Sequence, residues 1–144
     1  MRIYLDNCSL NRPYDDQSQL KIHLESEAKL WVQDEILRGR FELAWSYILE
    51  IENNQNPYLE RKESIGTWQS LAVIDIEASE ELLNQAKIIQ STGIKELDSL
   101  HIASAIMTNC VVFLTTDKGI IKKKDKINKI RIMNPVDFIL EEIE

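Results

Sequence analysis

A continuous apolar run, Val111-Val112-Phe113-Leu114, constrains the fold more than any other part of this chain. It consists of β-branched and aromatic residues without polar alternation, which is typical of a strand buried on both faces. Strands of this kind occur in parallel sheets that helices cover on either side. We therefore expect a central parallel sheet between two helical layers.

The segments around this run alternate between strand and helix patterns. Short strands are predicted at 2–5, 41–45, 71–76 and 130–133. Helical spacing of apolar residues predicts helices over about 19–38, 46–51, 59–69, 78–91 and 95–108, with short helices after 117 and from 135. This order predicts an α/β fold, a three-layer α/β/α sandwich with a central parallel sheet of about four to five strands. In such sheets the ligand crevice lies beyond the carboxyl ends of the strands.

The length and uniformity of the chain indicate one domain. It has 144 residues and contains no repeat, low-complexity stretch or Pro/Gly/Ser-rich linker. No apolar run approaches the roughly 20 residues that span a bilayer, and the N-terminus opens on a strand-like run instead of a signal peptide. We expect a single domain over residues 1–144, located in the cytoplasm and without membrane contact. Cys8 and Cys110 are expected at opposite ends of the sheet, as free thiols.

The charge of the chain argues against a protein that holds nucleic acid by electrostatic attraction alone. The formal net charge is −7, whereas such proteins carry a clear excess of basic residues. A nuclease is still compatible, because bound divalent cations reverse the local sign of charge. Positive charge gathers between Lys118 and Arg131, where Asp125 is the only acid. This stretch is either a solvated helix face or a ridge that follows phosphates.

Four acidic residues fall near the edge of the sheet where a ligand should bind, namely Asp6, Glu50, Asp98 and Asp117. Asp6 and Asp117 follow predicted strands directly. Glu50 lies four residues after Ser46, the expected N-cap of its helix, and is therefore expected on the same face. A capping-box glutamate would stand at position 49 instead, so Glu50 has no evident capping role.

Asp98 is the hardest of the four to explain as an ordinary residue. It shares a helix face with Ile102 and Ala105, where a carboxylate that nothing neutralises costs several kcal/mol. The other three have simpler alternatives. Asp6 could close an Asx-turn, Asp117 could cap the following helix, and a glutamate at position 50 could lie on the surface.

Clustered carboxylates without His or Cys partners select hard cations, so Mg²⁺ or Mn²⁺ is the expected cofactor. Like charges at close range repel one another, which raises at least one carboxyl pKa or leaves the empty site disordered. Two cations about 3.5–4 Å apart would activate a water and stabilise the leaving oxygen of a phosphodiester. This chemistry requires no nucleophile from the protein.

Four blocks of sequence surround these acids. They are YLDNCSLNRP at 4–13, SYILE at 46–50, KELDSLHIASA at 95–105 and LTTDK at 114–118. In this order and spacing the chain resembles PIN-domain ribonucleases, in particular the VapC-like toxins of type II toxin–antitoxin systems. The resemblance covers nearly the whole chain, and the last two blocks are the most specific.

The resemblance implies an endoribonuclease that depends on Mg²⁺ or Mn²⁺ and cleaves RNA. It also implies a homodimer, and a small antitoxin protein that blocks the acidic groove. The carboxylates that would bind metal and serve catalysis are Asp6, Glu50, Asp98 and Asp117.

The chain departs from the family pattern in two places. Many relatives carry Thr and then Ser or Asn directly after the first aspartate, where this chain has Asn7 and Cys8. We therefore expect Ser9 or a backbone amide to orient that carboxylate. Some relatives have a further acid two residues beyond the last aspartate, where this chain has Gly119, so a second metal is expected to bind weakly or only with substrate. Thr116 matches the family pattern and is expected to contact metal-bound water or phosphate.

Other residues are expected to support the site. Ser46 is the predicted cap of its helix. His101 lies about one turn after Asp98, and a hydrogen bond to that carboxylate is a simpler interpretation than proton shuttling. Arg12 and Lys118 flank the predicted crevice and are candidates for phosphate contact.

Three other functions stay open at this point. A catalytically silent PIN-like module would bind RNA or a protein through the same groove, and tight metal binding by the free protein would favour the enzyme over it. A phosphoacceptor receiver domain needs a lysine after a late strand, where this chain has Asn134. A structure-specific DNA nuclease needs an arch and clamp elements for which the chain has no room.

Overall fold

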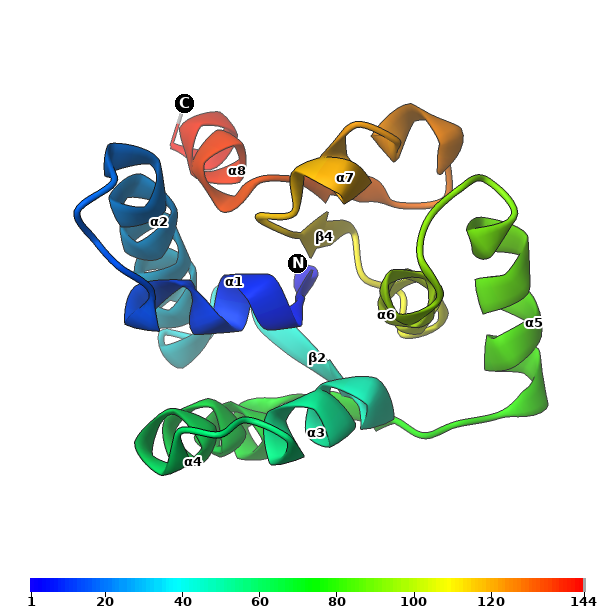
Figure 1. The fold of residues 1–144 in the computed structure, drawn as a ribbon, viewed down its shortest axis with the longest axis horizontal. Helices are drawn as coiled ribbons and strands as arrows, with labels where there is room; N and C mark the ends of the chain where they lie inside the picture. Colours follow the sequence, from blue (N-terminus) through cyan, green and yellow to red (C-terminus); the bar gives the residue numbers. More distant parts are fainter. Residues whose placement is uncertain (144) are drawn as a thin grey trace.

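Five short strands form one parallel sheet in the computed structural model, which describes residues 1–143 (Figure 1). Their order across the sheet is β3-β2-β1-β4-β5, and every neighbouring pair is parallel. The strands are β1 (Arg2–Leu5), β2 (Glu42–Ser46), β3 (Ile74–Ile76), β4 (Val112–Leu114) and β5 (Arg131–Met133). The predicted α/β/α sandwich around a parallel sheet is confirmed.

The helices follow the predicted pattern closely. The α-helices are α1 (Asn7–Asn11), α2 (Leu20–Leu37), α3 (Tyr47–Asn54), α4 (Leu59–Gly66), α5 (Glu80–Gln90), α6 (Glu96–Met107), α7 (Lys118–Ile121) and α8 (Pro135–Glu142). The 3-10 turns are η1 (Arg12–Tyr14), η2 (Thr67–Leu71) and η3 (Lys124–Lys126). Among residues 1–143, short α1 is the one α-helix that the sequence did not predict, because five residues are too few to show a period.

The central strand β1 lies between β2 and β4 and is buried along most of its length. Ile3 pairs with Val112, Tyr4 with Phe113 and the last residue of β1 with the last residue of β4. The rings of Tyr4 and Phe113 stack at 5.4 Å between centroids. Since β4 is buried at all three positions, the continuous apolar run is explained by coverage on both faces.

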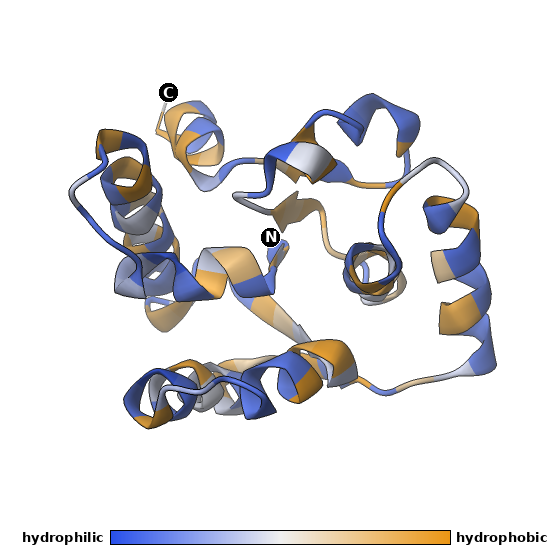
Figure 2. Ribbon diagram, viewed as in Figure 1, coloured by the Kyte–Doolittle hydropathy of each residue, from blue (hydrophilic) through white to orange (hydrophobic). Residues whose placement is uncertain are grey.

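Helices cover the two faces of the sheet in pairs. In Figure 1, α2 and α8 lie together on the left, while α5 and α6 lie together on the right. Figure 2 shows β4 as hydrophobic, whereas α5 carries hydrophobic residues on one side and hydrophilic residues on the other, as a helix with one buried side does. No helix within residues 1–143 combines the length and the apolar character needed to cross a membrane.

Local signals place the ends of these elements. Ser46 and Ser79 accept hydrogen bonds from the backbone amides three residues on and so begin α3 and α5. Gly39, with φ of +77°, follows the end of α2, as the sequence predicted. Cys8 follows β1 while Cys110 precedes β4, and both are free thiols.

Candidate metal centre

The carboxyl ends of the central strands meet at one edge of the sheet, and an acid lies at or beyond each end. Asp6 follows β1 and is the N-cap of α1. Asp117 follows β4 and is the N-cap of α7. Helix α6 carries Asp98 near its first turn. In Figure 1, α1, α3, α6 and α7 surround the middle of the molecule, where these strand ends lie.

Asp6 is buried, and each of its two oxygens accepts one hydrogen bond. Its Oδ1 accepts from the backbone amide of Ser9 at 2.9 Å, and its Oδ2 accepts from the hydroxyl of Thr115 at 2.5 Å. Burial raises the pKa of Asp6 to about 6, although these hydrogen bonds lower it. The orienting role expected of Ser9 or an amide is therefore shared with Thr115, which the sequence interpretation missed.

Asp98 and Asp117 both line a small cavity between α6 and α7. Partial burial raises the pKa of Asp98, and the negative charge of Asp117 raises it further. Asp117 uses Oδ1 to accept from the amide of Gly119 at 2.7 Å. Within residues 1–143 its Oδ2 receives no hydrogen bond, so this oxygen is available to a ligand.

Glu52, and not Glu50, lies within electrostatic range of Asp98 and Cys8. After burial and Asp117, the negative charge of Glu52 contributes to the raised pKa of Asp98. Glu50 is exposed and contributes to no such shift within residues 1–143. We call Asp6, Glu52, Asp98 and Asp117 the acidic cluster.

The expectation for Glu50 fails for a geometric reason. Ser46 is an N-cap with an extended backbone, at φ of −142°, so helical spacing counted from it does not describe the faces of α3. The buried side of α3 includes Ile48 and Leu49. Glu52 follows these by four and three residues and shares their face, and this spacing is the signal that could have identified it.

Cys8 lies within electrostatic range of the whole acidic cluster. Desolvation raises the pKa of its thiol to about 12, and the charges of Asp6, Asp117, Asp98 and Glu52 add to the rise. A thiol with this pKa is protonated at neutral pH and is not a nucleophile. Cys8 is therefore not a candidate nucleophile of this site.

A buried hydrogen-bond chain supports the glutamate of the cluster. The Tyr4 hydroxyl lies 2.7 Å from Ser46 Oγ and 2.7 Å from His101 Nδ1, and His101 Nε2 bonds the carboxylate of Glu52. A carboxylate only accepts, so with a neutral imidazole Nε2 donates to Glu52 and Nδ1 accepts from Tyr4. The expected bond from His101 to Asp98 is not formed, because the ring is turned toward α3.

The remaining predicted residues have distinct surroundings. Arg12 is ion-paired with Glu25 at 2.9 Å and with Asp15 at 3.1 Å, so its charge is already used within the fold. Lys118 is exposed and lines a separate pocket. Thr116 lies between that pocket and the one that includes Asp117.

The donor set of the acidic cluster fits a hard divalent cation. It consists of carboxylates alone, the ligand type that Mg²⁺ and Mn²⁺ prefer. Burial raises the pKa of Asp6, and burial together with the negative charge of Asp117 raises that of Asp98. A bound cation would favour the charged form of both carboxyl groups. No three His, Cys, Asp or Glu side chains within residues 1–143 are already arranged around a single ion position.

Comparisons with known proteins bear on the same architecture. Residues 3–126 match the family model described as PIN domain. The crystal structure of VapBC2 from Rickettsia felis bound to a DNA fragment from their promoter is similar, with a TM-score of 0.58, 18% identity and coverage of 93% of this chain and 98% of that one. The structure of VapBC-1 from nontypeable Haemophilus influenzae is also similar, with a TM-score of 0.62, 14% identity and coverage of 94% and 98%. No curated protein matches the chain.

Proposed function

The chain belongs to the PIN-domain family, and from this premise we propose that it is a metal-dependent endoribonuclease that hydrolyses RNA phosphodiesters. The observation that carries the proposal is the acidic cluster, in which four separate elements bring carboxylates to the carboxyl edge of a parallel sheet. Asp6 and Asp117 also cap α1 and α7, but the raised pKa values of Asp6 and Asp98 show that gathering acids at this edge has an energetic cost.

The ions that suit the cluster are Mg²⁺ and Mn²⁺, held by Asp6, Glu52, Asp98 and Asp117. When bound, such a cation polarises a phosphodiester and lowers the pKa of a water ligand. The chain itself supplies orientation. Ser9 and Thr115 hold Asp6 in place, and His101 holds Glu52.

The free oxygen of Asp117 and the half-buried Asp98 form the open side of the cluster. Both lie along small pockets that lead to the surface, whereas Asp6 is buried behind them. A phosphate would enter on this side. The raised pKa of Cys8 keeps its thiol neutral there, so the thiol adds no negative charge against the incoming phosphate.

The biological role we propose is that of the toxin in a toxin–antitoxin pair, located in the cytoplasm, with an antitoxin protein as partner and a homodimer as the assembled form. The support is the likeness in fold to two VapBC structures, together with the sequence blocks at 95–105 and 114–118. The acidic cluster would be the surface that the antitoxin blocks.

The test is cleavage of a mixed RNA pool by the partner-free protein with Mg²⁺, Mn²⁺ or EDTA. We expect cleavage with either ion, none with EDTA, and a loss of at least about 100-fold in Asp98→Asn. Asp125→Asn is the matched control, since Asp125 is exposed on η3, and it should cleave like the parent. Cleavage in EDTA, or full activity of Asp98→Asn, would overturn the proposal. An intact protein that neither binds metal nor cleaves would be the silent module.

A further inference from the structure

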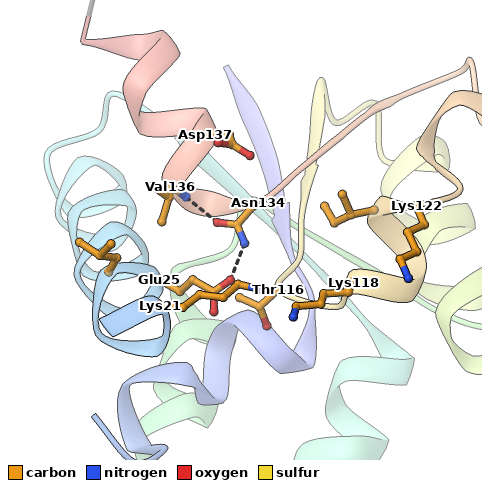
Figure 3. Close-up of a pocket in the computed structure, with 10 residues that line it drawn as sticks. Lys21, Glu25, Thr116, Lys118, Lys122, Asn134, Val136 and Asp137 are labelled. Carbon is orange, nitrogen blue, oxygen red and sulfur yellow. Dashed lines mark hydrogen bonds between the residues drawn. The ribbon is translucent and has the colours of Figure 1, made fainter. Parts of the chain in front are cut away.

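A lysine-lined pocket lies beside the acidic cluster, between α2, α7 and the start of α8 (Figure 3). Its volume is about 430 Å³, within the range of small-ligand sites. Lys21 comes from α2, while Lys118 and Lys122 come from α7 and its C-cap. In Figure 3, Lys21 and Lys118 approach the pocket from opposite sides, near Thr116.

The three lysines are not neutralised by the residues around them. None of Lys21, Lys118 and Lys122 forms an ion pair or a side-chain hydrogen bond within residues 1–143. The nearby carboxylate of Glu25 is fully buried and accepts from Arg12 and Asn134 instead. Asp137 also lines the pocket, but three lysines outnumber this one exposed carboxylate, so the pocket keeps an excess of positive charge in a chain whose net charge is −7.

This pocket differs from the rest of the basic stretch. Lys123 and Lys126 donate to the backbone carbonyls of Gly93 and Thr92, and Arg131 pairs with Glu141. The two lysines thus bind the loop between α5 and α6, and Arg131 binds the C-terminal helix α8. The part of the stretch that faces the pocket is left open to a ligand.

The pocket also has apolar walls. Leu24 is 46% exposed and lines it together with Ile121 and Val136. A cationic rim above apolar walls fits a ligand with an anionic end and a flat, weakly polar body. A nucleotide has this composition, with a phosphate at one end and a base at the other.

Thr116 connects the pocket to the acidic cluster. It lines the pocket and also lines a second hollow that includes Asp117, Asn7 and Cys8. A strand whose phosphate lies at Asp117 therefore has the lysine pocket as its next available site on this side.

We propose that the lysine pocket binds a nucleotide of single-stranded RNA beside the cleaved phosphodiester, with its phosphate on Lys21, Lys118 and Lys122 and its base against Leu24 and Val136. This rests on the proposed function, but it makes a separate claim about binding. Neutralising each of these lysines should weaken the electrostatic part of the affinity by the share that its phosphate contributes.

The experiment measures binding of a short fluorescent single-stranded RNA across a salt series, in the presence of Mg²⁺ and in an Asp98→Asn background that prevents cleavage. Replacement of Lys21, Lys118 or Lys122 by Gln should weaken binding and lower the slope of log affinity against log salt by about 0.7 for each phosphate that is no longer neutralised. Lys118→Arg keeps the positive charge, so its slope should equal that of the unsubstituted lysine pocket. Lys87→Gln, an exposed lysine on α5, is the matched control and should change nothing.

The outcomes separate this proposal from the proposed function. If the lysine variants had the same salt-dependence slope as Lys87→Gln, the proposal for the pocket would be wrong, whether or not the parent protein cleaves RNA. A lower slope in the lysine variants would support the pocket even if the parent protein failed to cleave. If a polyglutamate peptide bound with the same lysine dependence and RNA did not, the pocket would belong to an acidic protein segment and the proposal would be wrong. Replacing these exposed lysines should leave the unfolding temperature unchanged. A thermal unfolding measurement therefore checks that each variant is folded.

Discussion

The acidic cluster and the lysine pocket are neighbours, yet they are built in opposite ways. Asp6 is buried and has both oxygens held, and Glu52 is fixed through His101 and Tyr4. The lysines of the pocket are exposed and have no partners within residues 1–143. One region is fixed before a ligand arrives, whereas the other can adjust to it.

The difference follows from where each charge lies. A buried charge has lost water and needs hydrogen bonds to replace it, so burial and rigidity come together. An exposed ammonium keeps its water and its rotamer freedom, and it attracts phosphate at little structural cost. Under the two proposals, the fixed region would hold the cation and the exposed lysines would bind the RNA strand.

The sharpest test of the fixed region compares two glutamates on one helix. Glu52→Gln should lower RNA cleavage by about 100-fold or more, because it removes a cluster carboxylate. Glu50→Gln should stay within about two-fold of the parent, because Glu50 is exposed. Both are measured as kcat/KM at saturating Mg²⁺. The reverse ranking would restore Glu50 to the site and remove Glu52 from it.

The next effect concerns Lys29, which is a lysine like those of the pocket but is buried like Asp6 of the acidic cluster. Lys29 on α2 is 3% exposed and, within residues 1–143, has no carboxylate partner, and burial lowers its pKa to about 7. The unfolded chain therefore binds this proton more tightly, so stability should rise as pH increases from about 7 toward 10.5.

Lys29→Met should stabilise the protein by about 2 kcal/mol at pH 7, the scale seen when buried charged groups become apolar. The gain should shrink as pH approaches 10. Denaturant unfolding at several pH values measures it, with Lys87→Met as the exposed control. A gain that does not depend on pH would mean that packing, and not charge burial, is responsible.

A ten-fold effect is expected from the hydroxyl of Tyr4. Tyr4→Phe leaves Ser46 and His101 without this partner, which should cost about 1–3 kcal/mol of stability. Because His101 then orients Glu52 less firmly, Mg²⁺ affinity should fall by about 10-fold. Tyr58→Phe, at an exposed ring, is the control. If stability falls but the Mg²⁺ titration is unchanged, the chain of hydrogen bonds serves the core and not the metal site.

The smallest effect is expected at Gly119. A Cβ there would lie 3.1 Å from Asp117 Oδ1, so one of the two must shift by a few tenths of an ångström. A misplacement of about 1 Å can cost 100-fold, so Gly119→Ala should lower kcat by only about two- to five-fold. A rate equal to that of the parent would show that Asp117 tolerates movement as the lysines do.

Most of the fold and much of the site were open to prediction from the sequence. The apolar run at 111–114 led to the parallel sheet, and the resemblance to the PIN-domain family is confirmed. Asp6, Asp98 and Asp117 were named because they follow strands or interrupt an apolar helix face, which are local patterns. Their catalytic role stays a prediction.

What local patterns could not show is pairing across the chain. The hydrogen bond between Tyr4 and His101 joins residues 97 positions apart. From the sequence alone, Tyr4 is predicted only to be a strand residue. The sequence does not show that Arg12 forms an ion pair with Glu25 of α2. Glu50 was preferred to Glu52 because the count began at a cap whose backbone is not helical.

The place of β1 at the centre of the sheet sets an order of events during synthesis. Strand β4, the neighbour of β1, begins 110 residues after β1 begins. Thr115, which donates a hydrogen bond to Asp6, lies 109 residues after Asp6. A chain still emerging from the ribosome therefore has no assembled acidic cluster until residues 112–117 are free to fold. Fragments that stop before β4 lack Thr115 and Asp117, so we expect them to bind Mg²⁺ more weakly than the folded chain and to leave RNA uncleaved.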